Sequence, residues 1–297
     1  MKLIANGIGL EVEDSGGEGR PVVLLIMGLG MQLTAWPAEF VQSLVDAGFR
    51  VVRHDNRDIG LSQDFNEAGT GNLVWQSLRQ RLGLAVQSVY SLQDMANDAL
   101  GVLDALGIRH AHVVGASMGG MIAQRLAASA PGRATSLVSI MSSSGARNLP
   151  GPRPDVAAAL LRRPPSRTEA ALVAHSLGLV RLIASPAYPQ DDRALTDRIT
   201  LSLRRAYRPA GVVRQILAIG ADNSRAALLA HIASPTLVVH GDADPLVPVA
   251  CGEDTARRIP GARFIKVPGM GHDLPPQVIE ILLRHIVPFL QTAERRE

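Results

Sequence analysis

Short runs of aliphatic residues recur along the first half of the chain, and each run is followed by glycine or polar residues. The run at 22–27 leads into a helix that we expect Thr34 to cap, with Pro37 in its first turn, and the run at 49–54 leads into a polar loop. A strand that is covered on both faces has this continuous apolar character, whereas a strand with one wet face alternates. The alternation of strands and helices predicts an α/β fold with a mostly parallel sheet and helices on both faces.

The same alternation continues along the rest of the chain, with one interruption. A helix at 91–106 is predicted because Ser91 can cap its first turn together with Asp94, three residues further on. Further strands are expected at 10–13, 134–140, 235–240 and 263–267, and a final helix at 276–290.

The interruption lies between 142 and 232. This stretch has no strong strand pattern but contains prolines and two helical segments, at 168–183 and 191–207. We interpret 142–232 as a helical cap inserted after the sixth strand and laid over the carboxyl ends of the strands. The α/β core is then expected to consist of 1–141 and 233–297.

Composition and charge indicate a globular protein without a nucleic-acid footprint. The chain has 297 residues, of which 46% are apolar and 19% charged, and the formal net charge is only +3. Acidic residues are interleaved with the basic ones, so no nucleic-acid partner is expected. The arginines of the cap are interpreted as a solvated face, among them Arg162, Arg163, Arg204 and Arg205.

Cysteine content and the N-terminal sequence bear on the compartment. The single Cys251 excludes an internal disulfide and fits a reducing compartment, and we expect it to be a packing or surface thiol rather than a catalytic one. The residues after Met1 include no apolar segment of signal-peptide length. The longest apolar run, at 22–31, is too short to span a bilayer and is interrupted by glycines. These features predict a cytoplasmic protein with no membrane partner.

A G-x-S-x-G pentapeptide joins a predicted strand to a predicted helix. The strand begins at Ala111, the pentapeptide has Ser117 at its centre, and apolar residues recur at helical spacing in 121–127. Such a turn is so tight that side chains at the two glycine positions would clash. The hydroxyl of its serine stands clear at the carboxyl edge of the sheet. The helix N-terminus beside it favours negative charge. We therefore predict Ser117 to be a nucleophile, with Gly115 and Gly119 supporting the turn.

A serine hydroxyl needs a base to take its proton and a carboxylate to orient that base. His272 is the predicted base because it lies in a glycine-rich loop after the last predicted strand, whereas His54 and His240 are expected to be structural. Two carboxylates compete for the orienting role. We favour Asp244, which precedes a proline whose turn can direct the side chain toward His272. Asp242 is interpreted as a turn residue that bonds its own backbone amides.

The oxyanion formed during acyl transfer needs preorganised N–H donors. One is expected on the residue after the nucleophile, Met118, and the second on the loop after an early strand. In that loop, Leu29 is placed to donate, and Gly28 and Gly30 let the backbone turn inward.

Taken together, these residues resemble the α/β-hydrolase superfamily over almost the whole chain, since nucleophile, acid and base follow in the order Ser, Asp, His. Three stretches narrow the resemblance to the aclacinomycin methylesterase group of carboxylesterases. They read M-G-L-G at 27–30, followed by W-P at 36–37 and Phe40; H-D-N-R-D-I-G-L-S at 54–62; and P-G-M-G-H-D-L-P at 268–275.

The resemblance implies a triad of Ser117, Asp244 and His272, oxyanion N–H groups on Leu29 and Met118, and a mostly helical cap that shapes an apolar pocket. Many members of the superfamily have a histidine before the oxyanion glycine. This chain has Met27 there, a departure that the methylesterase group shares.

The segment at 55–62 is interpreted as a loop-fixing motif, with Arg57 and Asp58 held in a local polar network. No cofactor is expected. No metal is expected either, because the sequence has no H-x-x-x-H motif and no cysteine cluster at ligand spacing.

These observations predict a serine carboxylic ester hydrolase that acts through an acyl-enzyme on a small-molecule ester. A methyl ester on a bulky polyketide is the substrate that the resemblance suggests. A lactone or macrolide ring, a simple short-chain ester, cofactor-free perhydrolysis and carbon–carbon bond hydrolysis would use the same triad. Dehalogenases and epoxide hydrolases of this fold are disfavoured, because they place an aspartate where Ser117 stands. A non-catalytic receptor on a hydrolase fold is the alternative outside enzymes, and the sequence does not indicate an oligomeric state.

Overall fold

The chain folds around a single mixed sheet. A computed structural model describes residues 1–82 and 84–295 of the chain. Its sheet has eight strands in the order β1-β2-β4-β3-β5-β6-β7-β8. The strands are β1 (Lys2–Ala5), β2 (Ile8–Asp14), β3 (Val22–Ile26), β4 (Arg50–His54), β5 (Ala111–Ala116), β6 (Ala134–Ile140), β7 (Thr236–Gly241) and β8 (Arg263–Val267).

Six neighbouring strands, β4-β3-β5-β6-β7-β8, pair in parallel. The two strands at the edge beside β4 pair antiparallel, β1 with β2 and β2 with β4. Parallel neighbours need a crossover connection, which helices provide here. The prediction of a mostly parallel sheet in an α/β fold is confirmed.

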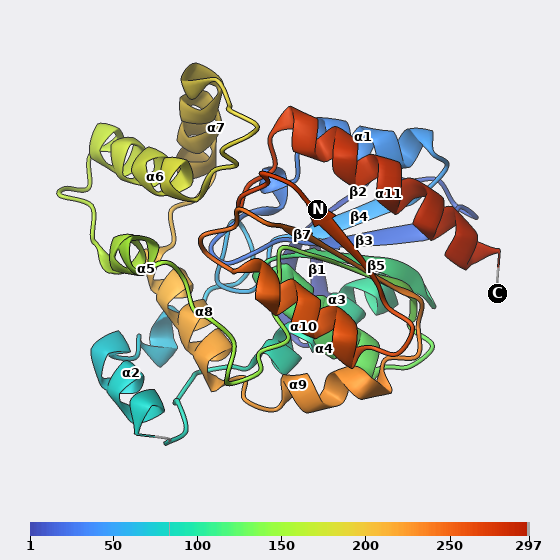
Figure 1. Cartoon of the computed structure of the whole chain (residues 1–297), viewed down its shortest axis with the longest axis horizontal. Coiled ribbons are helices and arrows are strands. Elements are labelled where there is room, and N and C mark those ends of the chain that lie inside the picture. Colours follow the sequence, from blue (N-terminus) through green and yellow to red (C-terminus); the bar gives the residue numbers. More distant parts are fainter. Residues whose placement is uncertain (83, 296–297) are drawn as a thin grey trace.

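Helices cover both faces of the sheet (Figure 1). Helices α1 and α11 lie together on one face, and α3, α4 and α10 lie on the other. The helices are α1 (Ala38–Asp46), α2 (Leu73–Arg81), α3 (Leu92–Ala105), α4 (Met118–Ser129), α5 (Pro154–Leu161), α6 (Glu169–Ile183), α7 (Asp192–Arg205), α8 (Pro209–Ala221), α9 (Arg225–Leu228), α10 (Val249–Arg258) and α11 (Pro276–Glu294), with 3₁₀ turns at Leu33–Ala35, Asn66–Ala68 and Leu229–His231.

The central strands divide their side chains between two hydrophobic cores. Leu24 and Ile26 of β3 point into the core under α3 and α4, whereas Val23 and Leu25 point into the core under α1 and α11. All four side chains are fully buried. Because successive side chains of a strand point to opposite faces, a strand buried on both sides must be apolar at every position. This requirement explains the continuous aliphatic run at 22–26.

The segment between β6 and β7 forms a helical layer beside the carboxyl edge of the sheet. Helices α5, α6, α7 and α8 of this segment lie away from the sheet in Figure 1, and α2 packs against α8. Helix α9 and the turn after it pack instead on α4 and α10 of the core. The domain boundaries at 142 and 232 stay a prediction.

Two local features differ from the sequence-based expectation. Thr34 lies within a 3₁₀ turn and caps no α-helix; α1 begins only after Pro37, since the residue before a proline is driven out of the helical region and Trp36 is extended. The edge strand β1 was not expected from the pattern. It pairs with β2 through a tight turn at Asn6 and Gly7, both with positive φ, a signature of two-residue hairpins.

Other predicted elements agree with the structure. The strands expected at 134–140 and 263–267 are β6 and β8. Ser91 caps α3 in a capping box with Asp94, as its spacing predicted.

Candidate active site

Ser117 occupies a strained turn between the end of β5 and the first residue of α4. Its backbone has φ 56° and ψ −123°, a left-handed conformation that is rare for residues other than glycine. The flanking Gly115 and Gly119 are required because backbone atoms of neighbouring segments approach them too closely for a side chain. A Cβ on Gly115 would lie 2.2 Å from the Gly119 carbonyl oxygen, and one on Gly119 would lie 2.0 Å from the Ile26 carbonyl oxygen. The chain is therefore built to present this one hydroxyl at the carboxyl edge of the sheet.

The structure brings Ser117, His272 and Asp244 into one chain of hydrogen bonds. Ser117 Oγ lies 2.9 Å from His272 Nε2, and His272 Nδ1 lies 2.7 Å from Asp244 Oδ2. The His272 side chain is 7% exposed and that of Asp244 is fully buried. A serine, an imidazole and a carboxylate connected in this order form the arrangement that activates serine nucleophiles. The three residues come from loops after β5, β7 and β8, which end at the same edge of the sheet.

The surroundings of Asp244 keep its carboxylate ionised and oriented. Asp244 Oδ1 accepts hydrogen bonds from the N–H groups of Leu246 and Val247, at 2.9 and 2.8 Å. Burial is the largest single influence on the Asp244 pKa and raises it. The facing His272 and the hydrogen bonds from His240, His272 and Val247 outweigh burial, so the pKa lies well below its usual range. A permanent negative charge therefore faces His272 Nδ1.

Asp242, the competing carboxylate, has a different task. Its Oδ1 accepts a hydrogen bond of 2.6 Å from the Gly269 N–H. It thus connects the loop after β7 to the loop that carries His272, rather than bonding its own turn. The structure places Asp244, and not Asp242, against His272.

The two predicted oxyanion donors, the N–H groups of Met118 and Leu29, belong to segments that adjoin Ser117. Met118 is the first residue of α4, and the first N–H groups of a helix have no partner within it. The loop at 28–30 passes over Ser117, because a Cβ on Gly28 would lie 3.0 Å from Ser117 Cβ. Gly30 has φ 68°, which turns the loop inward. Within residues 1–82 and 84–295, the Leu29 N–H donates to no other group. Both predicted donors thus belong to segments that adjoin Ser117, and their role in binding an oxyanion stays a prediction.

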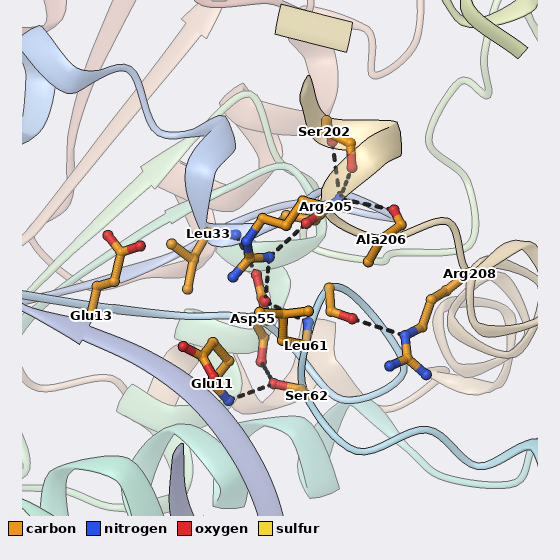
Figure 2. A network of polar contacts seen from close by, with 12 residues as sticks. Glu11, Glu13, Leu33, Asp55, Leu61, Ser62, Ser202, Arg205, Ala206 and Arg208 are labelled. Carbon is orange, nitrogen blue, oxygen red and sulfur yellow. Dashed lines mark hydrogen bonds and ion pairs between the residues drawn. The ribbon is translucent and has the colours of Figure 1, made fainter. Parts of the chain in front are cut away.

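The segment at 55–62 fixes the loops around the site, as its sequence predicted. Asp55 Oδ1 accepts from the Leu33 N–H at 2.7 Å, and Asp55 Oδ2 accepts from the Leu61 N–H at 2.9 Å and from Arg205 Nη1 at 2.7 Å. Figure 2 shows Asp55 at the centre of this network. Arg205 is the residue that corrects the sequence interpretation. It is not part of a solvated face, because it reaches from the end of α7 to a fully buried carboxylate.

Arg57 and Asp58 each form a buried two-pronged ion pair. Arg57 binds Asp98 of α3 through two bonds of 2.6 Å. Asp58 binds Arg214 of α8 at 2.8 and 2.6 Å. Breaking such a pair leaves an uncompensated buried charge, which is costly. The loop is thus fixed to the core by one charge and to the cap by the other.

The cap also contacts the loop that carries His272. The His272 N–H donates to the Ile183 carbonyl at 2.7 Å, where α6 ends. Asp273 accepts from the N–H and the hydroxyl of Ser185 and from Gln190. Burial is the main influence on the Asp273 pKa and raises it, although these hydrogen bonds act in the opposite direction.

Sequence reasoning missed the polar residues that join the cap to the loops around the site: Gln32, Ser185, Arg205, Gln215 and Asp273. The available signal is clearest in α8, where Arg214 and Gln215 interrupt an otherwise apolar helix. Polar residues in an apolar helix face predict buried hydrogen-bond partners. The identity of those partners depends on segments far apart in the chain.

Cys251 and His54 are both buried side chains. Cys251 is a buried free thiol, and burial raises its pKa. His54 is buried, and burial lowers its pKa. Among the described residues, no three histidine, cysteine, aspartate or glutamate side chains gather as a metal ion would require, and the expectation of no metal stays a prediction. In the same part of the chain, no helix combines the length and apolarity needed to cross a membrane.

Comparison with known proteins shows the family of this chain. The family model for the alpha/beta hydrolase fold matches residues 21–276. Rhodomycin D methylesterase DauP from Streptomyces sp. (strain C5) is 31% identical over 300 residues, covering 94% of this chain and 95% of that protein. Rhodomycin D methylesterase DnrP from Streptomyces peucetius is 31% identical over 315 residues, covering 98% of each chain. The resemblance predicted from the sequence is confirmed by these relatives.

Among solved structures, the enol-lactonase from Burkholderia xenovorans LB400 superimposes with a TM-score of 0.72 at 21% identity, covering 98% of this chain and 100% of that chain. A likeness at this identity supports the shared fold and leaves the substrate open.

Proposed function

Because this chain belongs to the alpha/beta hydrolase fold family, we propose that it is a serine carboxylic ester hydrolase that acts through an acyl-enzyme. The observation that supports the proposal most is the hydrogen-bond chain from Ser117 Oγ through His272 to Asp244 Oδ2. It coincides with a strained serine and with the Leu29 N–H, which donates to no other group among the described residues. The relatives named as methylesterases support ester cleavage as the reaction.

In the first half of the proposed reaction, Ser117 Oγ attacks the ester carbonyl carbon and His272 Nε2 takes the hydroxyl proton. The carbonyl π electrons move to oxygen, and the N–H groups of Leu29 and Met118 bind the resulting oxyanion. Asp244 holds the imidazolium in its orientation and stabilises its charge. The tetrahedral intermediate then expels the alcohol oxygen, which takes the proton from His272 Nε2. An acyl-enzyme and a free alcohol result.

In the second half, water attacks the acyl carbon while His272 Nε2 takes one of its protons. The same two N–H groups bind the second oxyanion. Collapse of this intermediate breaks the bond to Ser117 Oγ, which regains its proton from His272. The products of the cycle are a carboxylic acid and an alcohol, and no external oxidant or reductant takes part.

We propose a methyl ester on a bulky polyketide as the substrate class. The support is the printed activity of the two relatives, rhodomycin D methylesterases that match this chain over 94% and 98% of its length. The helical layer between β6 and β7 lies beside the site and is the region expected to set substrate size.

A substrate panel tests this proposal. Wild type and Ser117→Ala are compared on p-nitrophenyl esters of increasing chain length, on rhodomycin-type methyl esters and on a macrolactone, with acid and methanol measured directly. We expect wild type to release methanol from the polyketide ester and Ser117→Ala to be inactive. Turnover of lactones alone, or peracid formation in hydrogen peroxide, would select one of the alternative reactions. Tight binding without turnover would indicate a receptor and contradict the proposal.

A further inference from the structure

The loop that carries the Leu29 N–H is held from the cap by buried polar side chains. Gln215 of α8 is fully buried, and both ends of its amide are satisfied. Its Oε1 accepts a hydrogen bond of 2.9 Å from the Gly30 N–H, and its Nε2 donates to the Arg57 carbonyl at 3.0 Å. A glutamine with both ends bonded in a dry environment has one orientation, so it fixes the groups that it joins.

This contact fixes the peptide plane next to the proposed oxyanion donor. The Gly30 N–H belongs to the peptide group that directly follows Leu29. On the other side, Asn56 Nδ2 donates to the Met27 carbonyl at 2.9 Å and fixes the plane before Gly28. The peptide group that contains the Leu29 N–H therefore lies between two planes that side chains hold in place. Glycines at 28 and 30 would otherwise let this loop adopt many backbone conformations.

A second tether joins the same loop to the end of α7. Gln32 Nε2 donates to the carbonyls of Ser202 and Ala206 at 2.7 and 3.1 Å, which lie at the C-terminal end of that helix. Gln32 Oε1 accepts from Arg205 Nη1 at 2.6 Å, and Arg205 also binds Asp55. Figure 2 shows Arg205 and Asp55 beside Leu33, whose N–H is bound by Asp55. Both ends of the loop at 30–33 thus depend on cap residues.

We propose that Gln215 is a positioning residue for ester hydrolysis: it orients the Leu29 N–H toward the developing oxyanion, and Arg205 supports the same loop from α7. This inference rests on the proposed function. It implies that the oxyanion site is complete only while α8 is seated on the loop. The cap then contributes to the rate of the chemical step as well as to substrate binding, because an oxyanion donor acts only when preorganised.

The test compares Gln215→Met with wild type on p-nitrophenyl butyrate. Methionine keeps the length of the side chain and removes both hydrogen bonds. Since small displacements of a reacting group cost up to about 100-fold, we expect kcat to fall on the order of 10- to 100-fold while KM changes less than about threefold. The affinity for a trifluoromethyl ketone, which forms a tetrahedral adduct on serine, should fall by the same factor as kcat/KM.

Gln76→Met is the matched control. Gln76 of α2 is also a buried glutamine, and its Oε1 accepts a hydrogen bond of 2.9 Å from the Gln87 N–H. Among the described residues, no hydrogen bond joins Gln76 to the loop at 28–33. Its variant should keep the kcat and the ketone affinity of wild type. Arg205→Gln provides a second route if Gln215→Met does not fold. It removes the Arg205 contacts of the α7 tether, those to Gln32 and Asp55, and should lower kcat several-fold, on the order of 5-fold, with KM unchanged.

The outcomes separate this inference from the proposed function. Ester hydrolysis by wild type with unchanged kcat and ketone affinity in Gln215→Met would overturn the positioning role alone. A loss confined to KM, or an equal loss in Gln76→Met, would also overturn it. A wild-type protein that neither hydrolyses esters nor binds the ketone would overturn both the proposed function and the inference built on it.

Discussion

Two hydrogen-bond chains of serine, histidine and carboxylate run through this molecule, at opposite edges of the same sheet. At the carboxyl edge, Ser117, His272 and Asp244 are connected by contacts of 2.9 and 2.7 Å. Near the amino ends of β5 and β6, His112 Nδ1 lies 2.8 Å from Ser136 Oγ, and His112 Nε2 lies 3.0 Å from Glu294 Oε2. The distances alone do not distinguish the two chains.

The surroundings of the two serines differ. Ser117 has a left-handed backbone and precedes a helix, whereas Ser136 lies within the regular strand β6 and is fully buried. No helix N-terminus follows Ser136 to stabilise an oxyanion, because the next residues of the described chain continue the strand. We infer that three bonded side chains are not sufficient to make a serine a nucleophile, and that the strained turn and its N–H donors are needed as well.

The two histidines and carboxylates differ as well. Asp244 is fully buried with a pKa below its usual range, whereas the Glu294 side chain is 36% exposed at the end of α11. Burial lowers the pKa of His112 to about 4, so this imidazole is neutral near pH 7. The chain at the amino edge fits a structural role, in which His112 fastens the last helix to the sheet.

Exchanging the two serines for alanine gives the largest expected contrast. Ser117→Ala should lower kcat on p-nitrophenyl butyrate by about 10⁴- to 10⁶-fold, because the nucleophile is lost. Ser136→Ala should stay within about threefold of wild type, since a buried strand serine takes no part in the proposed reaction. Equal losses in both variants would remove the distinction between the two chains.

Replacing the carboxylate of each hydrogen-bond chain by its amide tests the same contrast. Asp244→Asn should lower kcat by about 10³- to 10⁴-fold, because an amide no longer stabilises the imidazolium or selects its tautomer. Glu294→Gln is the matched variant at the amino edge and should leave kcat unchanged. The effect of Asp242→Asn is informative too: if it exceeds that of Asp244→Asn in steady-state kinetics, the two aspartates have been assigned the wrong way round.

Two glycines sharpen the comparison through stability. Gly119→Ala would place a Cβ 2.0 Å from the Ile26 carbonyl oxygen, so we expect a loss of about 3 kcal/mol or more in the free energy of unfolding. Gly132, beside the amino edge, has φ 85° and open space around it. Gly132→Ala should cost only about 1 kcal/mol, from backbone strain. Urea denaturation measures both, and similar costs would show that the elbow is not under close-packing constraint.

The dependence of stability on pH tests the state of His112. An unfolded histidine binds a proton near pH 6.5, whereas folded His112 binds one only near pH 4. Its contribution to stability is therefore complete above pH 6.5, is lost as pH falls from 6.5 to 4, and changes no further below 4. This loss amounts to at most about 3 kcal/mol. His112→Gln should flatten the dependence of unfolding free energy on pH in this window, and an unchanged slope would contradict the buried, neutral state.

The sequence predicts those parts of the site that depend on local geometry. The serine between glycines, the histidine in a glycine-rich loop and the strands at 134–140 and 263–267 each have a signature within a few residues. Asp244 could be favoured over Asp242 because a proline follows it. Such local features can be predicted from the sequence because a tight turn restricts which residues can occupy it.

Contacts between distant segments could not be predicted in this way. Arg205 looks like one more exposed cap arginine until α7 is placed beside Asp55, which lies 150 residues earlier in the chain. The role of Gln215 likewise cannot be inferred until α8 is placed beside the loop at 28–30, where Gln215 binds the Gly30 N–H. Polar side chains in a cap take their roles from tertiary packing, which the helical pattern of the cap does not specify.

The assignment of Ser117 as the nucleophile, on which the acyl-enzyme depends, is tested most directly by covalent labelling. Diethyl p-nitrophenyl phosphate transfers its phosphoryl group to an activated serine and releases p-nitrophenol. Trypsin should release residues 110–125 as one peptide, in which Ser117 is the only residue with a hydroxyl side chain. Ser136 lies in a different tryptic peptide, which begins at Ala134. We expect about one equivalent of p-nitrophenol per chain and the added mass on 110–125 alone. A label on the Ser136 peptide, or no stoichiometric label, would contradict Ser117 as the nucleophile.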